Sequence, residues 1–238
     1  MARQKLECRF GSYVEYERVF DYRQAKPKVA PGGYQRIYRR FVGKDGRGGR
    51  LFGDWVQQLP RDLRRDRLTI NGQPTCELDY GSMQLVLLYV LADAPVPAAP
   101  DLYQMLGMGQ HREDMKMVLT LSVGNATRSE TVSAIGGRLR EQNRAGKGKA
   151  AGLYDAFWHH HAPANPHRDG ITEPAWPQLQ NLESRIALRV LALLLDRKIT
   201  AIPIHDSFVV QARHRDCLGA AMQDAFAALC PRRLIRIR

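Results

Sequence analysis

Two aspartates, Asp79 and Asp206, each stand at the end of a short apolar run, and this feature constrains the fold of the chain most. The first ends Thr75-Cys76-Glu77-Leu78-Asp79, and the second follows Ile202-Pro203-Ile204-His205. A carboxylate at the end of a buried strand is costly unless a cation meets it. We therefore expect the two strands, far apart in the sequence, to lie side by side in one sheet with both aspartates facing a common site.

The surrounding pattern indicates which elements could form that sheet. Asn71-Gly72 predicts a hairpin turn before the strand 75–80, and His205-Asp206-Ser207 predicts a second hairpin between 199–204 and 208–212. Apolar periodicity predicts helices over 83–91, 109–123, 179–195 and 217–229, with loops over 143–152 and 159–174. This order predicts an α+β fold in which an antiparallel sheet is packed by helices.

The charge of the chain favours a polyanionic partner. The formal net charge is +12, and residues 1–67 carry 17 Lys/Arg against 8 Asp/Glu. Such a surface attracts phosphate backbones and gains affinity by counterion release. Aromatic residues alternate with arginines between Tyr34 and Arg50, which suits base stacking with phosphate contact. Two alternatives stay open: the charge serves solubility, and the aromatics face the core of a hairpin.

Several classes are excluded by composition. No stretch approaches about 20 apolar residues, so a membrane span is not expected. The N-terminal residues lack the apolar region of a secretory leader. The four cysteines, Cys8, Cys76, Cys217 and Cys230, show no CxxC spacing, which argues against a zinc site or disulfide framework. A reducing, cytoplasmic location is therefore expected.

Two converging carboxylates suggest divalent-metal chemistry. Mg²⁺ takes one or two carboxylates together with water and phosphate oxygens, so two aspartates are enough, and Mn²⁺ is also suitable. In nucleotidyl transfer, two such ions clamp the attacking and leaving oxygens. Asp79 and Asp206 are therefore the candidate catalytic residues.

Four blocks and one helix carry a resemblance to a known family. They are Gly49–Pro60, Glu77–Ser82, Arg112–Lys116 and Ile204–Phe208, with Leu179-Gln180 on a helix. Their order and flanks resemble the palm and fingers core of family A DNA polymerases and the related single-subunit phage-type RNA polymerases. The resemblance covers most of the chain from Arg50 onward. It implies an antiparallel palm-like sheet packed by helices, with a small helical fingers-like insertion.

The resemblance also implies residue roles and a division of the chain. Asp79, Asp206 and the backbone carbonyl of Tyr80 would bind metal. The candidate nucleotide-binding residues are Arg112, Lys116 and Gln84, and the candidate nucleic-acid-binding residues are Arg50, His205 and Gln180. Residues 1–70 would form a basic region contacting nucleic acid, 71–105 and 175–238 the palm-like core, and 106–174 the fingers-like insertion.

The implied activity is metal-dependent extension of a nucleic-acid 3′ end, with primer–template and nucleoside triphosphates as partners. A template-directed DNA polymerase without proofreading is the first hypothesis, because too few residues precede the first block for an exonuclease. An RNA-synthesising or tailing enzyme is an alternative, since Gln84 and Ser207 replace acids of the DNA-polymerising members. A non-catalytic binding protein on a decayed core is another, because residues 117–125 lack the expected aromatic.

The hypothesis carries further expectations. Processivity should be low unless a clamp or primase partner assists, and a phage or mobile-element context would suit such a compact polymerase. Glu77 is expected in a salt bridge and not on the metal, and Glu183 in a polar stripe on the helix of Gln180. His159-His160-His161 and His167 are expected in a solvated loop. The aromatic residues Tyr154, Phe157 and Trp158 are expected in the core.

Overall fold

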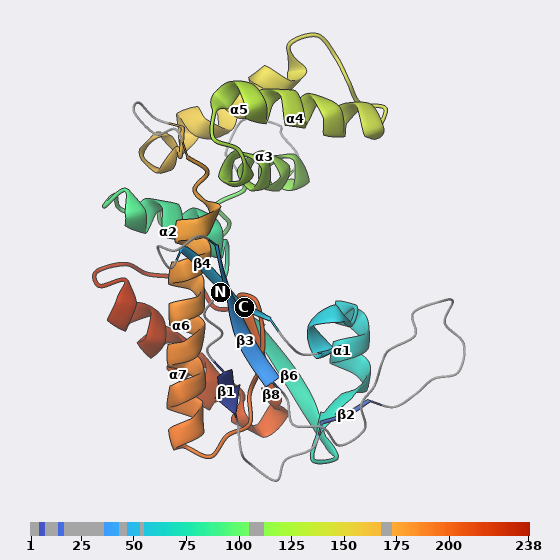
Figure 1. Cartoon of the computed structure of the whole chain (residues 1–238), viewed down its shortest axis with the longest axis vertical. Coiled ribbons are helices and arrows are strands. Elements are labelled where there is room, and N and C mark those ends of the chain that lie inside the picture. Colours follow the sequence, from blue (N-terminus) through green and yellow to red (C-terminus); the bar gives the residue numbers. More distant parts are fainter. Residues whose placement is uncertain are drawn as a thin grey trace. The chain divides into compact units, whose positions relative to one another are not determined.

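The computed structural model describes residues 5–7, 14–16, 36–42, 47–52, 55–104, 112–167 and 173–238. The chain divides into two compact units, the first formed by residues 1–81 with 180–238 and the second by residues 82–179. Figure 1 gives the course of the chain. The grouping places residues 82–105 with the helical unit, whereas the sequence analysis assigned 71–105 to the palm-like core. The functional names of these segments stay predictions.

The first unit holds the strands and two of the longer helices. Its strands are β1 (Lys5–Glu7), β2 (Val14–Tyr16), β3 (Arg36–Val42), β4 (Arg47–Phe52), β5 (Leu68–Ile70), β6 (Gln73–Asp79), β7 (Ile202–Ile204) and β8 (Ser207–Gln211). Its helices are the 3₁₀ turn η1 (Trp55–Gln58), α1 (Arg61–Arg67), the larger part of α6 (Trp176–Asp196), the 3₁₀ turn η3 (Ala212–His214) and α7 (Arg215–Leu229).

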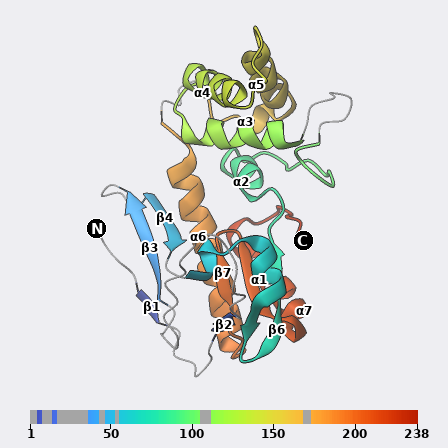
Figure 2. The same ribbon diagram turned by 90° about the vertical axis from the view of Figure 1, so that its right-hand side faces the viewer.

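The described strands form two antiparallel sheets. One has the order β1-β3-β4, and the other has the order β2-β5-β6-β8-β7. Figure 2 shows β1, β3 and β4 together, apart from the group that contains β6 and β7. Within the larger sheet β6 pairs with β8, and this pair joins the two sequence segments that form the first unit. This pairing brings the two predicted aspartate strands together.

Both predicted hairpins form. Asn71 and Gly72 take φ values of 53° and 68° between β5 and β6, the left-handed pair that a type I′ turn requires. Between β7 and β8, Ile204 pairs with Ser207, so His205 and Asp206 are the two loop residues. His205 has a φ of 59°, an uncommon conformation for a residue other than glycine.

The larger sheet is buried by apolar side chains. The residues Val56, Leu68, Ile70, Ile202, Ile204 and Val209 form one buried cluster. The helix α7 packs against β6 and β8. There Tyr80 contacts the rings of Phe208 and Phe226, and its hydroxyl donates to the Met222 carbonyl at 2.6 Å. These contacts of Tyr80 fix the end of β6 immediately after Asp79.

The second unit is helical. Its elements are α2 (Met83–Leu91), α3 (Arg112–Gly124), α4 (Arg128–Glu141), α5 (Lys149–His160), the 3₁₀ turn η2 (Ala162–Ala164) and the first residues of α6. The helix α2 is buried along most of its length, as its apolar run predicts. The helices α3, α4 and α5 pack on one another, and Trp158 Nε1 donates to Ser122 Oγ at 2.9 Å between α5 and α3.

The fold class is confirmed: the chain is α+β, with an antiparallel sheet packed by helices and a helical insertion. The core positions of Tyr154, Phe157 and Trp158 are confirmed too. No helix within the described ranges is long and apolar enough to cross a membrane.

Two local predictions are wrong. The expected loop 143–152 ends early, because α5 begins at Lys149 behind Gly148, which takes a left-handed φ of 73°. Of the four histidines expected in a solvated loop, His159 and His160 are exposed but end α5, His167 is half-buried, and His161 contradicts the expectation. His161 is fully buried, with Nδ1 at 2.8 Å from the Tyr89 hydroxyl and Nε2 at 3.0 Å from the Leu102 carbonyl. Burial lowers the pKa of His161 to about 4, so it serves the core as a neutral group.

Candidate active site

Strand pairing brings Asp79 and Asp206 to the same end of the sheet. Asp79 is the last residue of β6 and lies opposite Ser207, the first residue of β8. Asp206 precedes Ser207, and its carbonyl accepts a hydrogen bond from the Tyr80 amide at 3.1 Å. The left-handed φ of His205 turns the chain so that Asp206 leads directly into β8, beside β6.

Three polar atoms of this region are buried and lack a hydrogen-bond partner among the described residues. They are Asp79 Oδ1, His205 Nδ1 and Arg50 Nε. Buried polar groups in proteins are nearly always hydrogen-bonded, and the exceptions gather at catalytic or ion-binding sites. The carboxylate oxygen Oδ1 of Asp79 is therefore available to a ligand at this strand end.

The electrostatics of the two loop residues follow from burial. Burial raises the pKa of the Asp206 carboxyl, and the charge of Asp79 raises it further, while a hydrogen bond from its own backbone amide lowers it. Burial lowers the pKa of His205 to about 4, and the charges of Arg50 and Arg64 act in the same direction. His205 is consequently neutral at physiological pH, and the negative charge of Asp79 disfavours that of Asp206 unless a cation lies between them.

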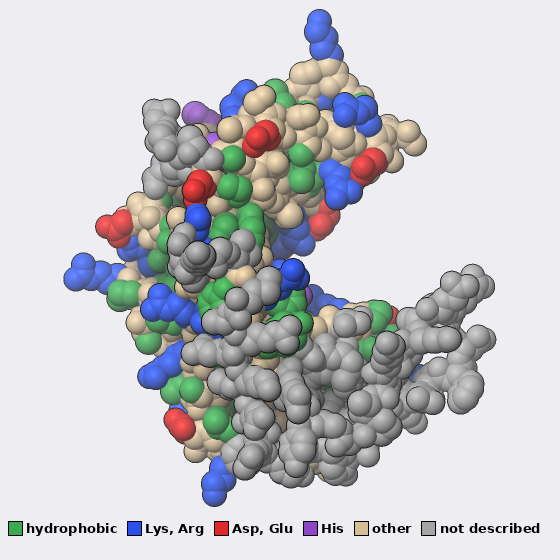
Figure 3. All heavy atoms as spheres, in the orientation of Figure 1, with side chains coloured by type: hydrophobic (Ala, Val, Ile, Leu, Met, Phe, Trp, Pro, Cys, Tyr) green, Lys and Arg blue, Asp and Glu red, His purple; other side chains and the backbone are tan. Residues whose placement is uncertain are grey.

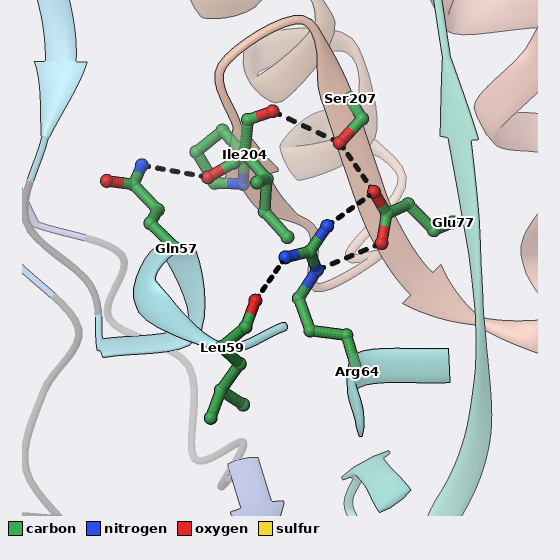
Figure 4. A network of polar contacts seen from close by, with 7 residues as sticks. Gln57, Leu59, Arg64, Glu77, Ile204 and Ser207 are labelled. Atoms are coloured by element: carbon green, nitrogen blue, oxygen red, sulfur yellow. Dashed lines mark hydrogen bonds and ion pairs between the residues drawn. The ribbon is translucent and has the colours of Figure 1, made fainter. Parts of the chain in front are cut away.

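Glu77 is engaged elsewhere. Arg64 binds it with two hydrogen bonds, Nε to Oε2 at 3.0 Å and Nη2 to Oε1 at 2.9 Å, and both side chains are nearly buried. Ser207 Oγ lies 2.9 Å from Glu77 Oε1 and 3.1 Å from the Ile204 carbonyl. Figure 4 shows this network, in which Arg64 also reaches the Leu59 carbonyl. The predicted salt bridge of Glu77 is confirmed, and Ser207 braces the turn.

Arg50 forms an ion pair with Glu183, which was expected only to lie in a polar stripe on its helix. Arg50 Nε on β4 lies 3.4 Å from Oε1 of Glu183 on α6. Glu183 is only 4% exposed, and burial raises its pKa to about 7, although Arg50 lowers it; Asp206 adds to the rise. The pKa of Glu183 rises because its side chain is almost completely desolvated, whereas its ion pair with Arg50 is too long to offset that cost. The expectation of a polar stripe is wrong for Glu183, since the residue is buried.

A second contact attaches the same strands to α6. Arg39 on β3 donates to Ser184 Oγ at 2.7 Å and to the Gly49 carbonyl at 2.8 Å, with its guanidinium over Phe41. Glu183 and Ser184 are adjacent, so α6 holds the β3–β4 pair at two points. The signal for Glu183 was present in the sequence: it follows Gln180 by three positions and therefore shares its helix face. Gln180 itself is half-buried.

The remaining predicted site residues, Arg112, Lys116 and Gln84, belong to the second unit. Arg112 and Lys116 start α3, four positions apart, and both are paired with acids. Arg112 donates to Asp101 and lies over the Tyr103 ring, and Lys116 Nζ lies 3.2 Å from Glu113 Oε1. The hydrogen bond that Arg112 donates to Asp101 is the main reason that the pKa of Arg112 is raised. Gln84 is half-buried on α2.

The charged N-terminal region is described only in part. Of the predicted aromatic and arginine-rich segment, Tyr34 and Lys44 lie outside the described residues. Tyr38 and Arg40 are exposed on β3, and Tyr38 stacks on Phe52. Figure 3 shows Lys and Arg side chains scattered over the drawn face among fewer Asp and Glu.

The residues present fit a divalent cation. No three His, Cys, Asp or Glu side chains among the described residues form a metal-holding group. Asp79 and Asp206 nevertheless supply two carboxylates, and Mg²⁺ commonly binds through one or two carboxylates with waters and substrate phosphates. The unpartnered Asp79 Oδ1 is the observation that favours a cation here.

The chain was compared with protein families, curated proteins and solved structures, and only solved structures match it. No protein-family model matches it, and no curated protein matches it. One similar solved structure is the POL domain of Pol1 from M. smegmatis in complex with DNA primer-template and dNTP, with a TM-score of 0.43 and 10% sequence identity. The match covers 79% of this chain and 45% of that chain, so this chain spans less than half of that structure. A match at this level does not identify a family.

Proposed function

We propose that the chain is a metal-dependent nucleotidyltransferase that extends a nucleic-acid 3′ end, of the template-directed DNA polymerase type. The observation that carries the proposal is the meeting of Asp79 and Asp206 at one strand end, with a buried Asp79 oxygen that has no partner among the described residues. Sequence order and residue types around both aspartates agree with that chemistry.

Asp79 and Asp206 would hold Mg²⁺ or Mn²⁺, together with the backbone carbonyl of Tyr80. When bound, the ions activate the attacking hydroxyl and neutralise charge on the phosphates. The protein's own contribution is to fix both carboxylates by backbone pairing before substrate arrives, so that little reorganisation remains. Neutral His205 adds no positive charge that would compete with the cation at Asp206.

Other residues bind the substrates in this proposal. Arg112 and Lys116 exchange their acidic partners for the triphosphate, where a guanidinium binds bidentately and an ammonium acts as a point charge. Gln84 contacts the incoming nucleotide. Arg50, His205 and Gln180 bind the primer–template, with Glu183 holding Arg50 in place until nucleic acid arrives.

The test is primer extension by the purified chain on DNA and RNA templates, with labelled deoxynucleotides and ribonucleotides. Incorporation is expected with Mg²⁺ and template, and it is expected to disappear in Asp79→Asn and Asp206→Asn while primer–template binding stays nearly unchanged. The matched control is Asp196→Asn, an exposed aspartate at the end of α6. Full activity in either site variant would remove the catalytic assignment.

The same assay separates the alternatives. Incorporation of ribonucleotides, or extension without template, would assign an RNA-synthesising or tailing enzyme. A non-catalytic binding protein is favoured by one observation, the pairing of Arg112 and Lys116 with acids. That function predicts primer–template binding with no incorporation and no Mn²⁺ binding, the latter measured by electron paramagnetic resonance on wild type and Asp79→Asn.

A further inference from the structure

Residues 236–238 pair through backbone hydrogen bonds with residues 79–81, at the edge of the candidate active site. The Arg238 amide donates to the Asp79 carbonyl at 2.9 Å, and the Asp79 amide donates back to the Arg238 carbonyl at 3.1 Å. The Gly81 amide donates to the Arg236 carbonyl at 2.7 Å, and Tyr80 and Ile237 form an antiparallel bridge. The aspartate strand is therefore paired with β8 on one edge and with 236–238 on the other.

The register of this pairing decides which side chains share a face. Residues directly opposite one another in an antiparallel pair point to the same side of the sheet. Arg238 is opposite Asp79 and Arg236 is opposite Gly81, so both arginines lie on the face of the catalytic aspartate. Tyr80 and Ile237 point to the other face, where Tyr80 packs against Phe208 and Phe226.

Gly81 lets the two arginines approach this face closely. A Cβ placed on Gly81 would lie 3.2 Å from the Arg236 carbonyl oxygen and 3.2 Å from Arg238 Nε. The stem of Arg238 therefore passes over Gly81 toward Arg236. Both arginine residues are exposed to solvent.

The chemistry of this arrangement suits phosphate. Arginine presents a planar fork of donors that binds phosphate oxygens bidentately. Asp79 Oδ1 accepts no hydrogen bond from a described residue, so that oxygen is not used by Arg238. A phosphate-bearing substrate positioned by Asp79 would bring its anionic groups to the face on which both arginines stand.

We propose that Arg236 and Arg238 form a phosphate-binding pair beside Asp79, held in place by the strand pairing of 236–238 with 79–81. The inference rests on the proposed function, because it takes the strand end of Asp79 as the substrate site. The ligand is a phosphate group, supplied by the nucleic-acid backbone or by the nucleoside triphosphate.

The experiment measures binding without catalysis. Fluorescently labelled primer–template and a labelled deoxynucleoside triphosphate are titrated separately in EDTA, at several salt concentrations, against wild type, Arg236→Ala/Arg238→Ala and Arg197→Ala. Arg197 is an exposed control after the end of α6. If the backbone is the source, primer–template affinity falls about tenfold or more in the double variant, and the salt slope falls by about two.

Each outcome bears on the proposal. Weaker triphosphate binding with unchanged primer–template binding would identify the triphosphate as the source and support the shared chemistry. Losses no larger than those of Arg197→Ala in both titrations would overturn the pair, as would a wild type that binds neither probe. Incorporation with Mg²⁺ is measured separately. If wild type incorporates nucleotide and the double variant binds both probes normally, the arginine pair is refuted while the proposed function stands.

A second variant separates binding from folding. Alanine keeps the backbone groups of 236–238, and Arg236→Lys/Arg238→Lys keeps both charges. The lysine variant should retain the wild-type salt slope while losing part of the affinity, because lysine cannot form the bidentate contact. A lysine variant that loses the salt slope as fully as the alanine variant, with the same fall in melting temperature, would assign a structural role and overturn the proposal.

Discussion

The two groups of candidate substrate-binding residues differ in how the folded chain satisfies them. At the strand end, Asp79 Oδ1 and His205 Nδ1 are buried without hydrogen-bond partners among the described residues. At the start of α3, Arg112 and Lys116 are partly exposed and are paired with Asp101 and Glu113. The first group is preorganised for a ligand, whereas the second must exchange one partner for another.

This difference separates two kinds of binding energy. At the strand end, folding has already removed the polar groups from water. A ligand that binds there therefore gains their interactions without a further desolvation cost for these groups. A ligand at α3 must displace an ion pair, so its net gain is the difference between two charge-assisted contacts. Substitutions at the strand end should consequently have large effects, and substitutions at α3 should have small ones.

The largest effect is expected for Asp79→Asn. Loss of one carboxylate removes several kcal/mol of charge stabilisation, so incorporation should fall about 10³-fold or more, whereas Lys116→Gln should lower it about tenfold. Single-turnover incorporation measures both. Equal losses in the two variants would break the distinction between the regions.

Removal of Arg64 should destabilise the chain strongly. Arg64→Ala leaves Glu77 nearly buried and unpaired, and breaking a buried pair costs about 3–5 kcal/mol. Arg112→Ala breaks a more exposed pair and should cost about 1 kcal/mol or less. Urea unfolding measures both. A small loss for Arg64→Ala would show that water enters the site of Glu77.

Stability should depend on pH through Glu183. Its pKa is raised from 4.5 to about 7 in the folded chain, so the folded state holds its proton over a range where the unfolded state has lost it. Stability from this group is therefore present below pH 4.5 and is lost as pH rises to about 7. Glu183→Gln should match wild type at pH 4 and exceed it at pH 8 by about 3 kcal/mol.

Urea unfolding in EDTA at both pH values measures the effect of Glu183. The charged groups facing its carboxyl are Arg50 on β4 and Asp206 in the β7–β8 turn. A stability difference that does not change between pH 4 and pH 8 would mean that Glu183 is charged throughout.

The smallest effect is expected for Asp101→Asn. The variant weakens the partner of Arg112 without removing the arginine, so the KM for nucleotide should fall about threefold while kcat stays near wild type. The matched comparison is Glu113→Gln, which weakens the acidic partner of Lys116 in the same way. An increase in KM would show that Asp101 positions Arg112 for the substrate and does not compete with it.

The sequence was most informative where local pattern and long-range pairing agree. The apolar runs before Asp79 and Asp206 and the Asn71-Gly72 turn predicted one antiparallel sheet, and β6 does pair with β8. The continuous apolar run 83–91 predicted a buried helix with the bounds that α2 has. In each case the local pattern and the burial of apolar side chains favour the same element.

The failures have local causes. The helix α4 received no prediction, although Thr127 and Glu130 form a capping box at its start. The start of α5 was read as loop because glycines and lysines precede its apolar residues. Glu183 was undervalued because its burial comes from tertiary contact with the β3–β4 strands. The pairing of 236–238 could not be predicted, since three residues contain too little pattern to specify a strand.

The amides of Asp79, Tyr80 and Gly81 are held from opposite edges, and this has a consequence for local unfolding. Asp79 and Gly81 donate to residues 238 and 236, whereas Tyr80 donates to Asp206. Hydrogen exchange at three consecutive residues should therefore report two separate openings. Detachment of the terminal segment exposes the first and third amides, and separation of the hairpin turn exposes the middle one.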